Sequence, residues 1–267
     1  MKHFFMVLFL LNFLVCGCAS VDNNIKVHYD YNTNTASEND YGEHILKGYP
    51  STDGTILSRE GYVLCHDNQK KVADWVSYHL TDEYLVKNVE RTDDFRADQE
   101  LPVVQRSELE DYKGSGYDRG HLAPAGDMTR NHTTMSESFL LSNMAPQIGA
   151  GFNRGIWRAL ETKVRKWAEE KKNLYVITGP VYEDKIGTIG ENNVEIPSHF
   201  YKIVISQQEP EVDAIAFILP NEKNPTSMLP QFITTIDNIE EKTGLDFLNE
   251  MEDSIEDVVE SRKAEMW

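Results

Sequence analysis

Three polar side chains within four residues, Asp118, Arg119 and His121, are the group in this sequence best suited to chemistry. Glycines bracket them in the run GSGYDRGH, residues 114–121, which is typical of a tight turn. Burying three such side chains without partners would be costly, so the run is unlike a core element. A neutral imidazole, with a reference pKa of about 6.5, can take a proton from water at neutral pH. A single histidine is more often structural, but this combination favours a general base.

A second group of candidates belongs to a predicted amphipathic helix over residues 154–171. Apolar residues recur there at spacings of three and four, which gives the helix one apolar face. Residues 153–172 carry a local charge of +4, from seven basic and three acidic side chains. Such a charge run can also be the solvated face of a helix. The candidates in this segment are Asn153, Glu161 and Arg165.

Four blocks of sequence around these residues resemble one family. The first is Asp118-Arg119-Gly120-His121, and the others are residues 141–147 (LSNMAPQ), residues 152–157 (FNRGIW) followed by Leu160 and Glu161, and the upstream run 91–98 with Leu101 and Pro102. Together they resemble the DNA/RNA non-specific endonucleases, which include mitochondrial endonuclease G and secreted bacterial nucleases. The blocks keep the expected order and spacing from about Gly61 to the C-terminal helix.

The resemblance implies roles for three residues in a ββα-metal finger, also called a His-Me finger. His121 would be the general base that activates water. Asn153 would bind Mg²⁺ through its amide oxygen, and Mn²⁺ could substitute; one protein ligand suits a cation that keeps several of its waters. Glu161, eight residues further on, would hydrogen-bond those waters. Asn153 taken alone would instead be read as a helix N-cap.

Four further residues complete the implied site. Arg119 and Arg165 would stabilise the charge of the transition state, and Asn143 would hydrogen-bond within the site. Asp118 could be catalytic, or could fix the turn or orient Arg119. Taken alone, Glu161 and Arg165 would be read as a surface ion pair at the i,i+4 spacing.

The reaction implied is metal-dependent hydrolysis of phosphodiester bonds in both DNA and RNA, leaving 5′-phosphates. Contacts to the phosphate backbone position a nucleic acid but carry no sequence information, so no base specificity is expected. Two alternatives remain. A catalytically silent, nucleic-acid-binding surface protein is disfavoured because His121, Asn153 and Glu161 are all present. A zinc hydrolase is disfavoured because no His-x-x-x-His or Cys-x-x-Cys spacing occurs. The chain could also form a homodimer, as some relatives do.

The overall charge argues against a nucleic-acid partner. The 267 residues carry a net charge of −18, whereas a polyanion is normally met by positive charge. The acidic residues are concentrated elsewhere, notably in residues 246–265. Because the local field decides whether a phosphate can dock, the composition permits a nuclease without indicating one.

The N-terminal residues predict export. Lys2 and His3 precede an apolar run, residues 4–15, whose length is typical of a signal peptide and short for a membrane span. Residues 1–20 are therefore a predicted signal peptide, with two possible cleavage sites. A lipobox-like sequence would leave a lipid-anchored Cys18, whereas cleavage near Ala19 or Ser20 would release a secreted or periplasmic protein. Residues 21–42, rich in polar residues, are a predicted flexible tether.

The remaining pattern predicts one α+β domain, residues 43–267, with a mixed or antiparallel central sheet flanked by helices. Cys65, in a strand-like run, is expected to be a small buried side chain without a disulfide. Turn residues between two strand-like runs predict a hairpin. The expected strands are 62–64, 72–78, 174–177, 200–205 and 214–219, and the further expected helices are 136–143 and 230–241.

Overall fold

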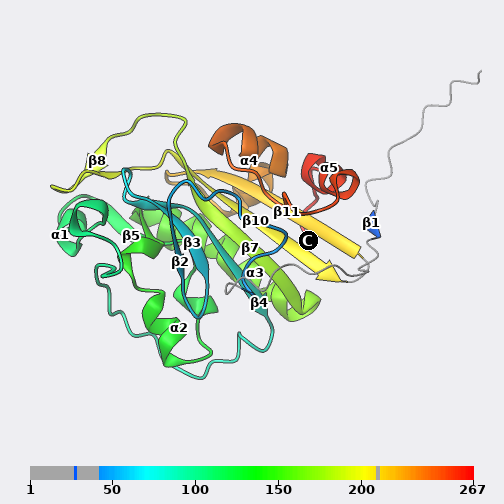
Figure 1. Ribbon diagram of the computed structural model, residues 1–267, viewed down its shortest axis with the longest axis horizontal. Helices are drawn as coiled ribbons and strands as arrows, with labels where there is room; N and C mark the ends of the chain where they lie inside the picture. Colours follow the sequence, from blue (N-terminus) through cyan, green and yellow to red (C-terminus); the bar gives the residue numbers. More distant parts are fainter. Residues whose placement is uncertain (1–26, 29–41, 209–210) are drawn as a thin grey trace, which may run out of the picture.

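The computed structural model describes residues 27–28, 42–208 and 211–267 (Figure 1). Its centre is an antiparallel sheet of eight strands, and helices lie on both faces. The predicted α+β class is confirmed. In spatial order the sheet contains β1 (Val27–His28), β11 (Glu211–Pro220), β10 (His199–Gln208), β7 (Asn173–Val181), β4 (Val72–Thr81), β3 (Val63–Asp67) and β2 (Thr55–Ser58), while β12 (Ile233–Thr234) pairs with β11.

The predicted hairpin is formed by β3 and β4. Its turn depends on Asp67, whose carboxylate accepts hydrogen bonds from the backbone N–H groups of Gln69 and Lys70 at 2.7 and 2.9 Å. Aspartate bonding of this kind stabilises a turn locally. Cys65 is fully buried in β3 and is a free thiol, as expected.

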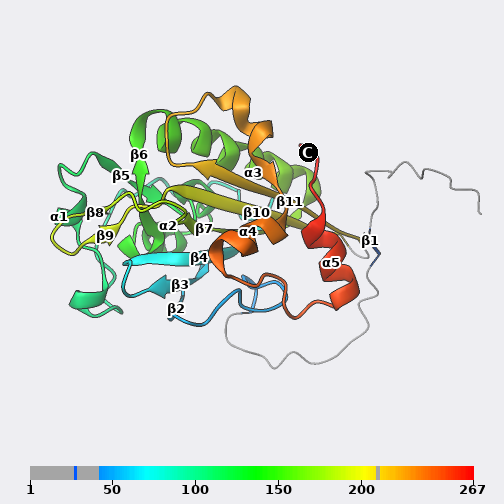
Figure 2. The same cartoon turned by 90° about the horizontal axis from the view of Figure 1, so that it is seen from above.

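Alternation along the strands divides the interior into two hydrophobic cores, one on each face of the sheet. In β10, Phe200 and Val204 face the first core, whereas Tyr201, Ile203 and Ile205 face the second. Helix α3 (Arg158–Lys171) covers the first core, and helices α4 (Ile236–Thr243) and α5 (Asp253–Ser261) cover the second (Figure 2).

Smaller elements surround the sheet on the side of α3. They are α1 (Leu109–Tyr112), the hairpin of β5 (Tyr117–His121) and β6 (Met144–Ile148), α2 (His132–Glu137), and the pair β8 (Thr188–Ile189) and β9 (Val194–Glu195).

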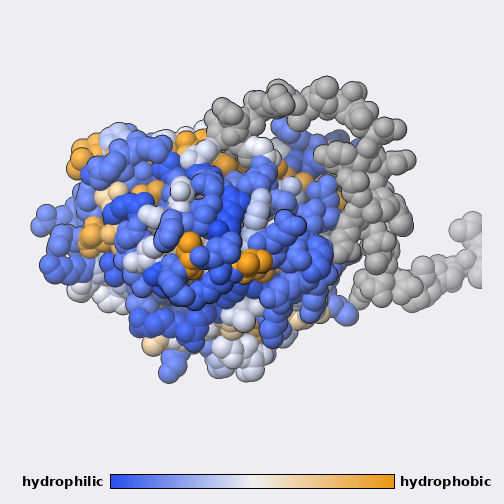
Figure 3. Space-filling view, turned by 90° about the horizontal axis from the view of Figure 1, so that it is seen from below, coloured by the Kyte–Doolittle hydropathy of each residue, from blue (hydrophilic) through white to orange (hydrophobic). Residues whose placement is uncertain are grey.

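The surface seen in Figure 3 is largely hydrophilic, and its apolar residues lie in small separate areas.

The single helix expected over residues 136–143 does not form, because α2 ends at Glu137 and only Leu141–Asn143 form a short 3₁₀ turn after it. Helix α2 begins after Asn131, whose side chain accepts a hydrogen bond from Thr134, and ends at Glu137. The chain then leaves the helix because its backbone pairs with Arg96, which receives a hydrogen bond from Leu141 at 2.9 Å. A contact with a distant segment overrides the local helical pattern here.

The helix expected over residues 230–241 begins later than predicted. Residues Thr226–Phe232 form a tighter 3₁₀ segment, and Ile233–Thr234 join the sheet as β12. Thr235 caps α4 by accepting a hydrogen bond from Asn238 at 3.1 Å. Pairing of β12 with β11 therefore takes the first residues of the expected helix.

The predicted signal peptide, residues 1–20 with Cys18, and most of the predicted tether, residues 21–42, lie outside the described residues. Within the tether segment, Val27–His28 form β1 beside β11, a short strand that the sequence did not indicate. In the part of the chain that the structure describes, no helix combines the length and apolar character that crossing a membrane requires.

Candidate active site

The run Asp118-Arg119-Gly120-His121 lies in β5, which pairs with β6. Alternation places Arg119 and His121 on one face of this hairpin. Gly120 lies opposite Ala145, and a Cβ atom at Gly120 would be only 2.1 Å from the side chain of Gln147. A larger residue between the arginine and the histidine would therefore require the buried side chain of Gln147 to move.

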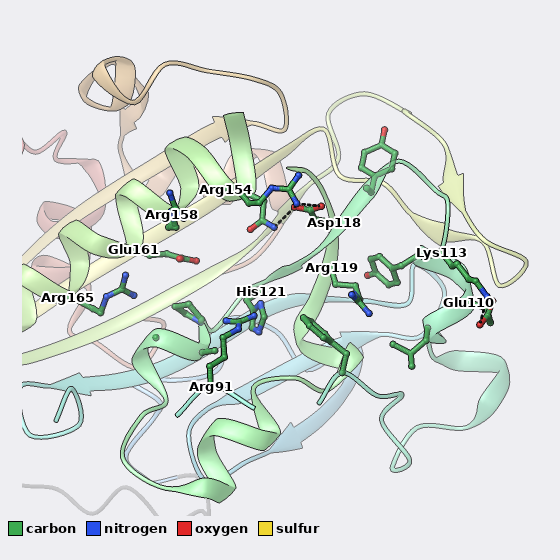
Figure 4. Close-up of a pocket in the computed structure, with 18 residues that line it drawn as sticks. Arg91, Glu110, Lys113, Asp118, Arg119, His121, Arg154, Arg158, Glu161 and Arg165 are labelled. Atoms are coloured by element: carbon green, nitrogen blue, oxygen red, sulfur yellow. Dashed lines mark hydrogen bonds and ion pairs between the residues drawn. The ribbon is translucent and has the colours of Figure 1, made fainter. Parts of the chain in front are cut away.

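A cleft of about 800 Å³ opens between this hairpin and α3 (Figure 4). Six basic and three acidic side chains line it, so the cleft is locally positive although the chain is acidic overall. The predicted residues Asp118, Arg119, His121, Asn153, Glu161 and Arg165 all line it, together with the unpredicted Arg91, Lys113, Arg158 and Glu110 and with Arg154.

His121 is half-buried between two phenyl rings, with ring centroids 5.7 Å from Phe95 and 5.0 Å from Phe139. Its Nε2 has no hydrogen-bond partner among the described residues. Burial, together with the positive charges of Arg91 and Arg119, lowers the pKa of His121 to about 3. The imidazole is therefore neutral at neutral pH, in the state that can accept a proton.

Asn153 is oriented by Asp118. The amide nitrogen of Asn153 donates a hydrogen bond of 2.9 Å to the Asp118 carboxylate. The same carboxylate accepts a hydrogen bond of 3.0 Å from Arg154, and Figure 4 shows these two side chains together. Because the amide nitrogen is engaged, the amide oxygen of Asn153 is the atom left for a cation. Of the two roles considered for Asp118, the geometry favours the structural one, but its partner is Asn153 rather than Arg119.

The helix expected from residue 154 begins later. Segment η4 (Gly149–Trp157) contains non-helical residues, among them Gly155 with φ −125° and ψ −111°, and regular helix starts at Arg158 with Trp157 as its N-cap. Asn153 is thus not the N-cap of α3, and the reading as a cap is wrong. Asn153 and Glu161 reach one cleft through an irregular turn rather than along two regular helical turns.

Beneath the cleft lies a buried lysine, Lys202, that no sequence motif indicates. Lys202 is fully buried in β10, on the face covered by α3, with its Nζ 4.7 Å from the centre of the Trp157 ring. No hydrogen-bond partner of this Nζ occurs in the described part of the chain. Burial raises the pKa of Glu161, and the positive charge of Lys202 opposes that rise. The two groups are an electrostatically coupled pair.

Arg165 does not form the ion pair with Glu161 suggested by the i,i+4 spacing. Its Nη1 instead donates to the fully buried Asp127 carboxylate at 2.8 Å, and Tyr78 donates to the same carboxylate at 2.9 Å. The charge of Asp127 raises the pKa of Arg165 against the effect of burial. Asp127 thus holds this guanidinium at the wall of the cleft.

Asn143 lies below the site rather than in it. It is fully buried and does not line the cleft. Its Oδ1 accepts a 2.9 Å hydrogen bond from the Ala123 N–H, and its Nδ2 donates to the carbonyl groups of Ala123 and Ser138, each at 2.9 Å. Asn143 therefore fixes the chain that directly follows His121, and the expectation that it bonds within the site is corrected to this supporting position.

Several residues of the site are not predicted by the sequence pattern. Lys202 had a signal, because it is the one charged residue in the apolar run 200–205. Arg91 belongs to a block that was recognised, but no role was assigned to it. Asp127 carried no comparable signal, since its partners Tyr78 and Arg165 are distant in sequence. The histidines that matched no motif, His66, His79, His132 and His199, do not line the cleft.

A family model and the most similar known proteins all indicate the same family. A family model described as DNA/RNA non-specific endonuclease matches residues 40–254. The chain is 38% identical over 225 residues to Nuclease C1 of Cunninghamella echinulata var. echinulata, covering 79% of this chain and 89% of that protein. It is 37% identical over 220 residues to the mitochondrial endonuclease G of Caenorhabditis elegans, covering 76% and 71%.

The fold agrees as well. A chain in the crystal structure of the EndoG/EndoGI complex, which concerns the mechanism of EndoG inhibition, is 35% identical and superposes with a TM-score of 0.75. The match covers 82% of this chain and 95% of that chain. Since the family model spans most of the chain and includes every residue of the cleft, this enzyme belongs to the DNA/RNA non-specific endonuclease family.

Proposed function

We propose that this nuclease hydrolyses phosphodiester bonds in DNA and RNA, in a reaction that depends on Mg²⁺, with His121 as the general base and Asn153 as the metal ligand. One observation carries the proposal: an unpartnered neutral imidazole and an amide oxygen freed by Asp118 line the same positive cleft. This combination provides a proton acceptor, an oxygen ligand and charge for a phosphate.

The donor set suits a hard cation. Asn153 would hold it through Oδ1, and Glu161 would accept hydrogen bonds from its waters; Mg²⁺ favours oxygen ligands and keeps much of its hydration shell. When bound, the ion supplies positive charge beside the phosphate and the leaving 3′-oxygen. Mn²⁺, with similar ligand preferences, is expected to substitute.

The protein's own residues account for the remaining steps. His121 takes a proton from a water molecule while the water oxygen forms a bond to phosphorus. The bond between phosphorus and the 3′-oxygen breaks, and this oxygen leaves as a hydroxyl group after taking a proton from solvent. Arg119 and Arg165 stabilise the negative charge that develops on the phosphate. The products are a 3′-hydroxyl and a 5′-phosphate.

His121 also needs enough basicity to act. Burial and the charges of Arg91 and Arg119 lower its pKa, and a bound phosphate would offset those two charges. Substrate binding is therefore expected to raise the pKa of His121 toward its ordinary value. Since the cleft is lined by cations that suit the backbone, DNA and RNA are both expected as substrates without base preference.

The competing function is binding of nucleic acid without cleavage. The test is digestion of plasmid DNA and of RNA with MgCl₂, with and without EDTA, by wild type, His121→Ala and the control His199→Ala. We expect metal-dependent cleavage of both substrates by wild type and control, with 5′-phosphate ends, and cleavage slower by at least about 100-fold in His121→Ala. Cleavage by His121→Ala at the wild-type rate would refute the assigned base, and inactive wild type that still binds DNA would establish the binding-only function.

Export, lipid anchoring at Cys18 and homodimer formation remain separate proposals from the sequence. Metabolic labelling with palmitate tests the anchor, by comparing wild type with Cys18→Ser. Label on wild type alone supports the anchor, and cleaved, unlabelled wild type supports release of a secreted or periplasmic protein. Sedimentation of the purified protein measures whether it forms a dimer.

A further inference from the structure

A cluster of carboxylates lies on the face of the sheet opposite the cleft. Asp237 and Glu240 of α4 and Glu260 of α5 each offer an oxygen, and the three oxygen atoms lie within 4.8 Å of one another. Helices α4 and α5 pack against each other and cover the second hydrophobic core. The three carboxylates therefore lie where α4 and α5 meet, and neither helix lines the cleft.

Glu260 distinguishes this cluster from an ordinary acidic surface. Only 6% of the residue is exposed, and its Oε1 has no hydrogen-bond partner in the described residues. A buried carboxylate without a partner is costly unless it is neutralised. Burial, together with the negative charges of Glu240, Asp237 and the nearby Glu256 and Asp246, raises the pKa of Glu260 to about 9.

Among the described residues, no ion pair joins a basic side chain to Asp237, Glu240 or Glu260. Residues 236–261 contain ten acidic side chains and one basic one, Lys242. Lys242 is paired with Glu183, and Arg262, just after α5, is paired with Asp213 of β11. One oxygen of Glu240 already accepts a 2.7 Å hydrogen bond from the Phe247 N–H, which holds this carboxylate in place. Neutralisation must therefore come from a proton or from a cation.

We propose that Asp237, Glu240 and Glu260 bind a Ca²⁺ ion that joins α4 to α5. Ca²⁺ accepts six to eight oxygen ligands in flexible geometry, including bidentate carboxylates and water. The exposed Asp237 leaves one side of the cluster open to water molecules that complete such a shell. Binding would replace a proton on Glu260, because a metal ligand must be deprotonated.

The test measures melting temperature and calcium binding on the full-length protein. CaCl₂ is titrated into metal-free wild type, Glu260→Gln, and Glu241→Gln, a matched control at an exposed position of α4. Wild type and the control should gain several degrees in Tm and bind with proton release, whereas Glu260→Gln should lose both effects. The Asn153→Ala variant, which removes the proposed ligand in the cleft, should keep them.

Two control measurements distinguish a loss of calcium binding from a folding defect. Glu260→Gln should have a higher Tm than wild type without calcium, since it removes a buried ionisable group, so a folding defect would be visible. Its nuclease activity with MgCl₂ should equal that of wild type. An equal calcium response in Glu260→Gln, or none in wild type, would overturn the proposal and leave Glu260 as a protonated buried acid.

Discussion

The two faces of the central sheet each bury charge, but they neutralise it differently. On the face covered by α3, Lys202 is close enough to affect the pKa of Glu161, and Arg165 pairs with Asp127. On the opposite face, Glu260 is surrounded by other acids. Opposite charges are thus mixed at the cleft, and like charges are gathered under α4 and α5. A net charge of −18 is compatible with a phosphate site because the sheet separates these two regions.

Among the substitutions at the cleft, where opposite charges are mixed, Asn153→Ala is expected to have the largest effect. Loss of the amide oxygen should lower kcat/KM by at least about 100-fold, because it removes the proposed ligand to the metal. Asn153→Asp should also be impaired, because it replaces the hydrogen bond to Asp118 with repulsion between two carboxylates. Initial rates over a range of MgCl₂ concentrations measure both. Wild-type rates in Asn153→Ala would exclude this residue as the ligand.

Asp118→Asn should have a smaller effect, through the orientation of Asn153. An amide at position 118 can donate as well as accept, so the Asn153 amide is no longer held in one orientation. We expect about a 10- to 100-fold higher MgCl₂ requirement, with much of the maximal rate recovered at high MgCl₂. A lower maximal rate with an unchanged MgCl₂ requirement would show that Asp118 does not act through Asn153.

Lys202→Met tests the charge beneath the cleft. Methionine fills a similar volume without the charge, so Glu161 would lose an interaction that favours its ionised form. We expect about a tenfold lower kcat, with Tm unchanged or higher because burying an ammonium group is costly. The control is Lys166→Met, at an exposed position of α3. Equal rates in the two variants would show that Lys202 has only a packing role.

The smallest expected effect is on Tm, through Glu260 on the face of the sheet covered by α4 and α5. In the unfolded chain Glu260 has an ordinary pKa of 4.5, and in the folded protein it is about 9. Its protonated form therefore stabilises the fold fully below about pH 4.5, and this contribution is lost as pH rises through about 9. With EDTA present, the Tm advantage of Glu260→Gln over wild type should grow across this range. A constant difference would contradict the raised pKa.

The charges around Glu260 determine how the Tm difference between Glu260→Gln and wild type changes with pH. Burial and the charges of Asp237, Glu240, Glu256 and Asp246 all favour the protonated form. Adding CaCl₂ should make the difference between the two proteins independent of pH, because the cation replaces the proton. Thermal melts at several pH values, with and without calcium, measure both effects.

The sequence predicted the parts of the site that depend on local pattern. The apolar face of α3, the β3–β4 hairpin and the glycine-bracketed run at 118–121 are all readable from spacing. The remaining parts depend on contacts between distant segments. Asp118 orients Asn153 across 35 positions, and pairing with Arg96 ends the helical pattern before Asn143. Gly155 interrupts the helix because of its backbone conformation, which no periodicity of apolar residues reveals.

The central claim is that His121 acts in the chemical step rather than in binding. The most direct measurement is single-turnover cleavage of a labelled DNA duplex by His121→Ala, with enzyme in excess and binding measured separately by fluorescence anisotropy. We predict a cleavage rate lower by about 10²- to 10⁴-fold with affinity close to that of wild type. Cleavage at the wild-type rate, or a loss explained entirely by weaker binding, would contradict the assignment of His121 as the general base.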